Sequence, residues 1–223
     1  MPETRKAFHE ELGELRADVI RLGAMVVEAI QAATDALSAC DLTKAEEVIA
    51  SGTDPDMITE AIEDRCYQLL ARQQPMAVDL RTIVGILRVN HELELTAHLM
   101  VSVAKAARRL YPNRLDPKLR GIIDRMREQA TAQLELAVDA FADADHTKAA
   151  ALADMNENMG DLQKDLFRAI LSAEHVNEMS LQRAVQVALV ARFFERTGDH
   201  AVNIGDRVSY MVTGHLPSVA AQV

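Results

Sequence analysis

The chain reads Ala33-Thr-Asp-Ala-Leu-Ser-Ala-Cys-Asp-Leu-Thr-Lys-Ala45 and, 104 residues later, Ala137-Val-Asp-Ala-Phe-Ala-Asp-Ala-Asp-His-Thr-Lys-Ala149, with seven of thirteen positions identical. A second pair of segments, residues 89–98 and 190–199, repeats at a distance of 101 residues. A repeat of this length indicates two similar units rather than a solenoid of short ones. The difference of three residues between the two distances falls between the paired segments, where helical chains gain or lose turn residues. Function is therefore sought first in features that both copies carry.

Composition favours helices. The chain has 223 residues, of which 49% are hydrophobic and 26% are charged. It has no Trp, three Tyr and five Phe, whereas strands draw on aromatic and β-branched residues. We therefore predict an all-α fold of two tandem, pseudo-symmetric three-helix bundles with six long helices. The predicted repeats occupy residues 1–111 and 119–223, and the Pro-containing stretch 112–118 is the predicted linker.

Capping residues and apolar periodicity place the six helices at about residues 5–39, 41–74, 75–110, 119–144, 147–172 and 178–213. Asp41 is predicted to cap the second helix, whose early part is broken by Gly52 and Pro55. Pro75 is predicted to open the third helix, because proline fits the first helical turn.

The net charge and the cysteine content limit the classes of partner and the cellular location that we expect. A net charge of -10 argues against nucleic acid, because phosphate binding needs concentrated Lys and Arg. The two cysteines, Cys40 and Cys66, have no CxxC spacing, and no apolar export signal is visible. A cytoplasmic location is therefore expected. The longest nearly apolar run, residues 185–191, is too short to cross a bilayer, so we expect membrane association only indirectly, through partners.

Charged pairs flank the apolar seams of two helices. The seam of the predicted sixth helix consists of Val190, Phe194, Thr197, Ala201, Ile204, Val208 and Met211, and that of the third of Val89, Leu93, Thr96, Met100, Val103 and Leu110. One residue onward, about 100° round the helix, lie Glu195 with Asp199 and Glu94 with His98. Each pair is spaced i, i+4 at the margin between core and solvent, so its two side chains can hold one object.

Two further helices carry matching pairs. Glu157 and Asp161 lie four residues apart in the predicted fifth helix, and subtracting 101 leads to Asp56 and Glu60 in the second. Two like charges about 4 Å apart repel by roughly 1 kcal/mol in water and about 4 kcal/mol at an effective dielectric of 20. If the helices of each half bring their pairs together, a bound cation would offset this repulsion.

The donor types indicate which metals such a site would hold. Carboxylate oxygens suit Mg, Mn, Ca or oxidised iron, whereas the imidazole of His98 favours Zn, Mn or Fe in the first half. We therefore predict a divalent or trivalent metal ion (Zn, Fe, Mn or Mg). The alternative is that the carboxylates are solvated or paired with Arg81, Arg192 and Arg196. Ferritin-like di-iron chemistry is disfavoured, because none of the seven His has a Glu three residues before it.

Two stretches resemble a known family. The sequence Phe194-Glu-Arg-Thr-Gly-Asp-His-Ala-Val-Asn-Ile204 is similar to the signature ERxGDHAxNI of the PhoU family of phosphate-signalling regulators. The sequence Gln73-Gln-Pro-Met-Ala-Val-Asp-Leu-Arg81 resembles the QxPxAxDLR segment at the start of that family's third helix. The resemblance covers essentially the whole chain and identifies it as a member of the actinobacterial type.

The resemblance implies a cytosolic, usually dimeric protein that mediates between the Pst phosphate ABC transporter, through its ATPase subunit, and the PhoR-type sensor histidine kinase. The family's metal-binding E/DxxxD motifs map onto Glu195 with Asp199 and onto Glu94 with His98. His98 departs from the usual Asp of that motif, and Leu95 stands where the second half has Arg196.

The resemblance further implies a homodimeric regulator that acts by binding and damps the expression of phosphate-starvation genes. The sequence contains no Gly-rich phosphate loop, nucleophile elbow or HExxH motif, so we do not expect an enzyme. The alternatives are a metal-dependent hydrolase or redox protein that uses the carboxylate clusters, and a metal-free helical scaffold.

Overall fold

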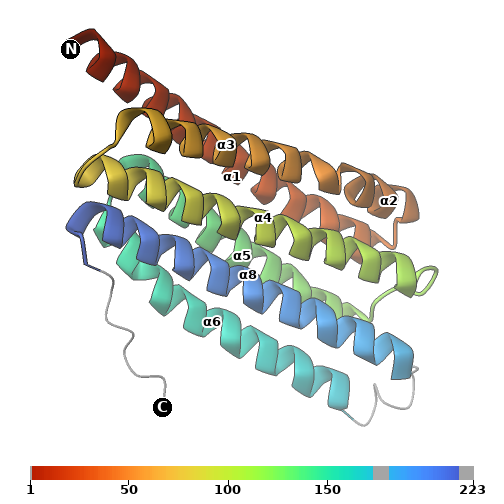
Figure 1. Ribbon diagram of the computed structural model, residues 1–223. Helices are drawn as coiled ribbons and strands as arrows, with labels where there is room; N and C mark the ends of the chain where they lie inside the picture. Colours follow the sequence, from red (N-terminus) through yellow and green to blue (C-terminus); the bar gives the residue numbers. More distant parts are fainter. Residues whose placement is uncertain (1, 173–180, 216–223) are drawn as a thin grey trace.

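The computed structural model describes residues 2–172 and 181–215, and these residues fold into helices joined by short turns (Figure 1). The elements are α1 (Pro2–Ala39), α2 (Leu42–Ala50), the 3-10 helix η1 (Ser51–Thr53), α3 (Asp54–Gln73), α4 (Val78–Leu110), α5 (Pro117–Asp143), α6 (His146–Leu171) and α8 (Leu181–Thr213). The prediction of an all-α fold is confirmed.

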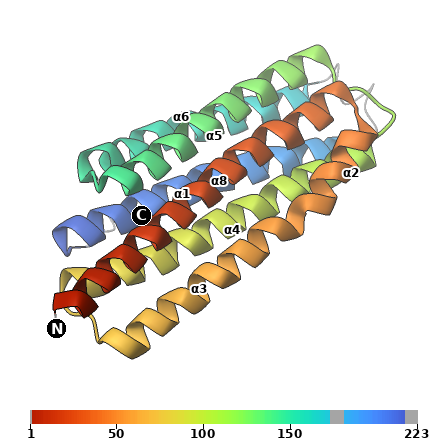
Figure 2. The ribbon, with the colours of Figure 1, turned by 90° about the horizontal axis from the view of Figure 1, so that it is seen from above.

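The long helices form two three-helix bundles that lie side by side (Figure 2). In the first bundle α1, α3 and α4 pack on one another, and α2 packs on α1 and α4. In the second bundle α5, α6 and α8 pack on one another. The bundles meet where α4 packs along α8 and α1 along α5, so α3, α4, α8 and α6 follow one another down the view in Figure 1. Because this interface is extensive, the division into domains at residues 112–118 stays a prediction.

The predicted apolar seams lie in the core. All thirteen seam residues of α4 and α8 are buried, and Phe194 and Leu93 are completely inaccessible to solvent. Burial at this spacing follows from 3.6 residues per turn, which returns every third or fourth side chain to the same face. Since the seams are fixed in the core, the side chains one position onward are held at the edges of the bundles.

The helix ends agree with the sequence prediction at most places. Asp41 accepts a hydrogen bond from the backbone N–H of Lys44 at 3.0 Å and so caps α2. The prediction that Pro75 opens the third helix is wrong, because α4 begins at Val78. The intervening turn contains two non-glycine residues with positive φ, Gln74 and Ala77, and such conformations cannot continue a helix. The predicted start of the last helix, residues 178–180, lies outside the described residues.

The second helical segment is interrupted in one half and continuous in the other. In the first half α2 gives way to the three residues of η1 before α3 begins, whereas α6 runs without a break. Three residues are also the difference between the two repeat distances in the sequence. The break at Gly52 and Pro55 was predicted, and it sets the position of the first turn of α3 against α4.

In the part of the chain that the structure describes, no helix combines the length and the apolar character that crossing a bilayer requires.

Candidate functional site

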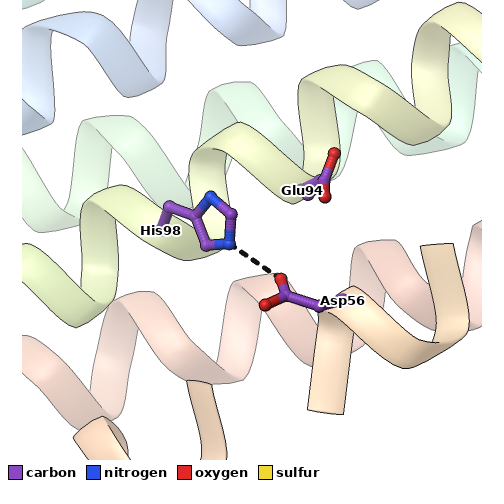
Figure 3. A group of neighbouring side chains, drawn as sticks. All are labelled: Asp56, Glu94 and His98. Atoms are coloured by element: carbon purple, nitrogen blue, oxygen red, sulfur yellow. Dashed lines mark hydrogen bonds and ion pairs between the residues drawn. The ribbon is translucent and has the colours of Figure 1, made fainter. Parts of the chain in front are cut away.

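Three of the predicted metal ligands come together in the first bundle. Asp56 lies in the first turn of α3, and Glu94 and His98 lie one turn apart on α4. One ligand atom from each residue can be chosen so that all three lie within 4.8 Å of one another. His98 Nε2 is 2.7 Å from Asp56 Oδ1, and Figure 3 shows these two side chains facing each other with Glu94 one turn along α4. The sequence prediction that the second and third helices share a cluster therefore has a geometric counterpart.

Helix geometry explains why this group forms. Because Glu94 and His98 are four residues apart, α4 presents both on one side, and the buried residue Leu93 before Glu94 fixes how far that side turns toward α3. Asp56 lies at the N-terminal end of α3, where the backbone N–H groups and the helix dipole favour a carboxylate. Asp56 and Glu94 are partly exposed and His98 is exposed, so the group can exchange ions with solvent.

The fourth predicted ligand of the first half stays apart. Glu60 lies one turn after Asp56, at an exposed position of α3, and it does not belong to the group of three. Glu94 has a further contact, because Oε2 lies 3.3 Å from Nδ1 of the exposed His91. His91 thus contacts one of the candidate metal ligands and does not itself belong to the group of three.

The four predicted ligands of the second bundle do not form a comparable group in the described structure. Arg192 donates a hydrogen bond to Glu195 from one turn earlier in α8. On α6, Glu157 is exposed, and Asp161 accepts a hydrogen bond from Lys164 Nζ at 2.8 Å. Pairing with Arg192 was part of the alternative stated for these carboxylates, and Glu195 follows it. The partner of Asp161, Lys164, was not among the side chains considered. A metal site in this half stays a prediction.

The pKa values record the local charge. Burial and the negative charge of Asp199 raise the pKa of Glu195, in spite of the opposing effect of Arg192. Asp161 shows the reverse, because the hydrogen bond and charge of Lys164 lower its pKa. Glu195 and Asp199 are therefore close enough to repel each other, as their spacing predicts.

A partly buried amide network, which sequence reasoning missed, lies in the second bundle near Asp199. Asn156 on α6 donates a hydrogen bond to Asp199 Oδ1 at 3.0 Å, and Gln133 on α5 donates to Asn156 Oδ1 at 3.3 Å. Gly198 admits this network, because a Cβ there would overlap the amide oxygen of Asn156. Gln133 is completely buried, and a polar residue within the apolar stripe of α5 was the signal that could have revealed it.

A second buried pair links the two bundles. Glu92 on α4 accepts hydrogen bonds from His200 Nδ1 at 2.7 Å and from Asn203 Nδ2 at 3.2 Å on α8. Burial of Glu92 acts to raise its pKa, but these hydrogen bonds and the neighbouring histidines outweigh it, and the pKa falls below the ordinary value. The structure gives His200 a carboxylate partner, Glu92, that the sequence did not reveal.

Comparison with known proteins gives consistent results. The model of the PhoU domain matches residues 19–107 and 123–208 of this chain. The phosphate-specific transport system accessory protein PhoU homolog 1 of Mycobacterium tuberculosis (strain H37Rv) is 34% identical over 215 residues, which cover 96% of each chain. The crystal structure of PhoU from Pseudomonas aeruginosa matches with a TM-score of 0.87 at 27% identity and covers 93% of this chain and 100% of its own. The crystal structure of the phosphate transport system regulatory protein PhoU from Streptococcus pneumoniae matches with a TM-score of 0.87 at 28% identity and covers 95% of this chain and 100% of its own.

Proposed function

The chain belongs to the PhoU family, and on this basis we propose that it is a negative regulator of the phosphate-starvation response. In this role it couples the Pst phosphate transporter, through the ATPase subunit, to a PhoR-type sensor histidine kinase. It works in the cytoplasm as a homodimer, by binding rather than by catalysis. The observation that carries the proposal is similarity over nearly the full length to a phosphate-specific transport system accessory protein.

The regulatory role is tested in the native host. Deleting the gene should raise expression from a phosphate-starvation promoter in phosphate-replete medium, and a plasmid copy should restore repression. Affinity purification of the tagged chain from replete cells should recover the transporter ATPase and the kinase. Unchanged promoter activity after deletion would refute the regulatory role. Hydrolysis or redox turnover of a substrate by the purified, metal-loaded protein would refute the proposal that the chain acts without catalysis.

We also propose that Asp56, Glu94 and His98 hold a metal ion. The donor set fits such an ion, because two carboxylates and one imidazole suit Zn, Mn or Fe, and the close approach of the carboxylates favours neutralisation by a cation. When bound, the ion would supply positive charge that ties the first turn of α3 to the middle of α4. The residues themselves orient the donors, since both helices are fixed by their buried faces.

Metal binding is tested by elemental analysis and by titration of the chelator-treated protein with Zn, Mn, Fe or Mg. The variant Asp56→Ala/His98→Ala should lose metal, whereas His146→Ala, which removes an exposed histidine from the other bundle, should keep it. Metal retained in full by the double variant would refute the assignment. Measuring the stoichiometry of Glu195→Ala/Asp199→Ala tests the second half, because a second metal site there predicts the loss of one ion per chain.

A further inference from the structure

The break between α2 and α3 leaves a pocket that the candidate metal site does not use. This pocket has a volume of about 270 Å³ and lies between α1, the segment around η1 and the middle of α4. Its apolar lining includes Met25, Ala32, Met100 and Val101, and two carboxylates, Glu28 and Asp54, also line it. The pocket thus combines an apolar interior with negative charge.

Small residues line this pocket in the first bundle, and larger ones stand at the matching positions of the second. At repeat distance 104, Ala32 corresponds to Leu136 and Ala29 to Gln133. In the second bundle the side chain of Gln133 reaches Asn156, so an amide pair occupies the region between α5 and α6. In the first bundle Gly52 lies against Val101, and a Cβ at Gly52 would come within 2.6 Å of Val101 Cγ2. Larger side chains at the positions of Ala29 and Ala32 are therefore expected to fill the space.

The two carboxylates of the pocket lack partners in the chain. The exposed side chains of Glu28 and Asp54 form no hydrogen bond or ion pair with another described residue, and no Lys, Arg or His lines the pocket. Asp54 lies in the first turn of α3 and gains from the helix dipole there, but Glu28 lies within α1 and has no such support. The pocket therefore complements a group with an apolar body and a positive charge.

We propose that this pocket binds a segment of a partner protein that inserts an apolar side chain next to a Lys or Arg. The apolar side chain fills the interior, and the cation meets Glu28 and Asp54 at the same time. The volume of about 270 Å³ has room for one apolar anchor side chain of the kind that dominates protein interfaces. This inference rests on the proposed function, because it supplies a contact through which a regulator can hold a partner.

The test uses the full chain with ¹³C-labelled methionine methyl groups, since Met25 and Met100 report on the pocket directly. The probes are the amides of acetyl-Leu-Arg and acetyl-Leu-citrulline, which have nearly the same shape and differ in charge. The Arg probe should shift both methyl resonances and should bind about fivefold more tightly than the citrulline probe at low salt. Equal affinities of the two probes would overturn the proposal.

Two variants separate shape from charge. Ala32→Leu copies the residue of the second bundle at a partly exposed position and should abolish the shifts. Glu28→Gln/Asp54→Asn leaves the space unchanged and should make the two probes equal. Glu47→Gln removes an exposed carboxylate outside the pocket and should behave like the wild type.

The remaining outcomes distinguish the ligand source and the dependence on function. If isopentylammonium shifts the methionine resonances and the Leu-Arg probe does not bind, the ligand is a free amine and the partner assignment is wrong. If Glu28→Gln/Asp54→Asn lowers the recovery of a partner from cells while metal content is unchanged, the pocket is a partner contact. If this variant and folded Ala32→Leu recover all partners in full, the pocket proposal fails and the regulatory proposal stands.

Discussion

The buried pair of Glu92 and His200 should stabilise the contact between the two bundles, and replacing Glu92 by Leu tests this. Only 13% of the Glu92 side chain and 8% of the His200 side chain are exposed, and Oε2 of Glu92 lies 2.7 Å from Nδ1 of His200. Nε2 of His200 is buried without a hydrogen-bond partner in the described structure, so Nδ1 carries the whole hydrogen bonding of the ring. Removing the carboxylate therefore leaves the imidazole buried and unpaired.

The size of the effect follows from these contacts. A hydrogen bond to a charged group contributes about 1.5–3 kcal/mol net, and an unpaired buried polar group costs about 1–3 kcal/mol. The bond from Asn203 contributes less, because Asn203 is exposed. We expect Glu92→Leu to lower the free energy of unfolding by about 2–4 kcal/mol, which is close to the range for breaking a buried pair. Replacing both partners should cost less than the sum of the two single changes, because the double variant has no orphaned group.

Urea unfolding followed by circular dichroism, in the presence of a chelator, measures these differences at pH 7. Glu47→Leu is the matched control, since Glu47 is exposed and should change stability by no more than about 0.5 kcal/mol. The effect should also depend on pH. The folded pKa of Glu92 lies below its ordinary value of 4.5, so its stabilising contribution is present above that value and is lost as the pH falls through the folded pKa. If Glu92→Leu and Glu47→Leu unfold at the same urea concentration, the pair contributes nothing and the reasoning is wrong.

Three further predictions concern other parts of the chain. Asp145→Ala should lower the thermal midpoint at pH 7, because the side chain caps α6 by accepting hydrogen bonds from the N–H groups of residues 147 and 148. These hydrogen bonds lower the pKa of Asp145 in the folded state, so the loss of stability should shrink as the pH falls through that pKa. Asp145→Asn should keep a cap that does not titrate. Phe194→Ala should cost about 3–5 kcal/mol in urea unfolding, since the ring is completely buried, and a cost below 1 kcal/mol would show that the core collapses around the gap. Burial raises the pKa of the Cys66 thiol to about 12, so iodoacetamide at pH 8 should modify the native chain at Cys40 and not at Cys66, and mass spectrometry of tryptic peptides would reveal the contrary.

Periodicity was sufficient to predict the fold because burial acts on every turn of a helix. The seams of α4 and α8 were identified from spacing, and they are buried as a set. Local details were predicted less completely than the fold, as the turn before α4 shows. Pro75 is compatible with a helix start, but Ala77 has a positive φ and the helix begins only at Val78. No residue type in that turn predicts this later start.

The candidate site was predictable in part, for a reason of the same kind. Spacing of four shows that Glu94 and His98 share a side of one helix, and the repeat indicates that Asp56 belongs with them. Spacing does not show how far each position lies from the neighbouring helix, so Glu60 was grouped with them and remains apart. The amide of Asn156 beside Asp199 depends on three helices at once, and no pattern within one helix contains it.

The two halves therefore differ in how they neutralise the same arrangement of charge. In the second bundle an arginine and an amide already contact Glu195 and Asp199. In the first bundle Asp56 contacts His98, and Glu94, which lies near both, contacts the exposed His91. Successive residues of a helix are turned by about 100°, so two residues apart they face opposite ways. Glu94 belongs to the group with Asp56, while Glu92 on the same helix contacts α8. The two carboxylates therefore connect opposite sides of α4 to different neighbours, Glu94 to the group on the side of α3 and Glu92 to α8.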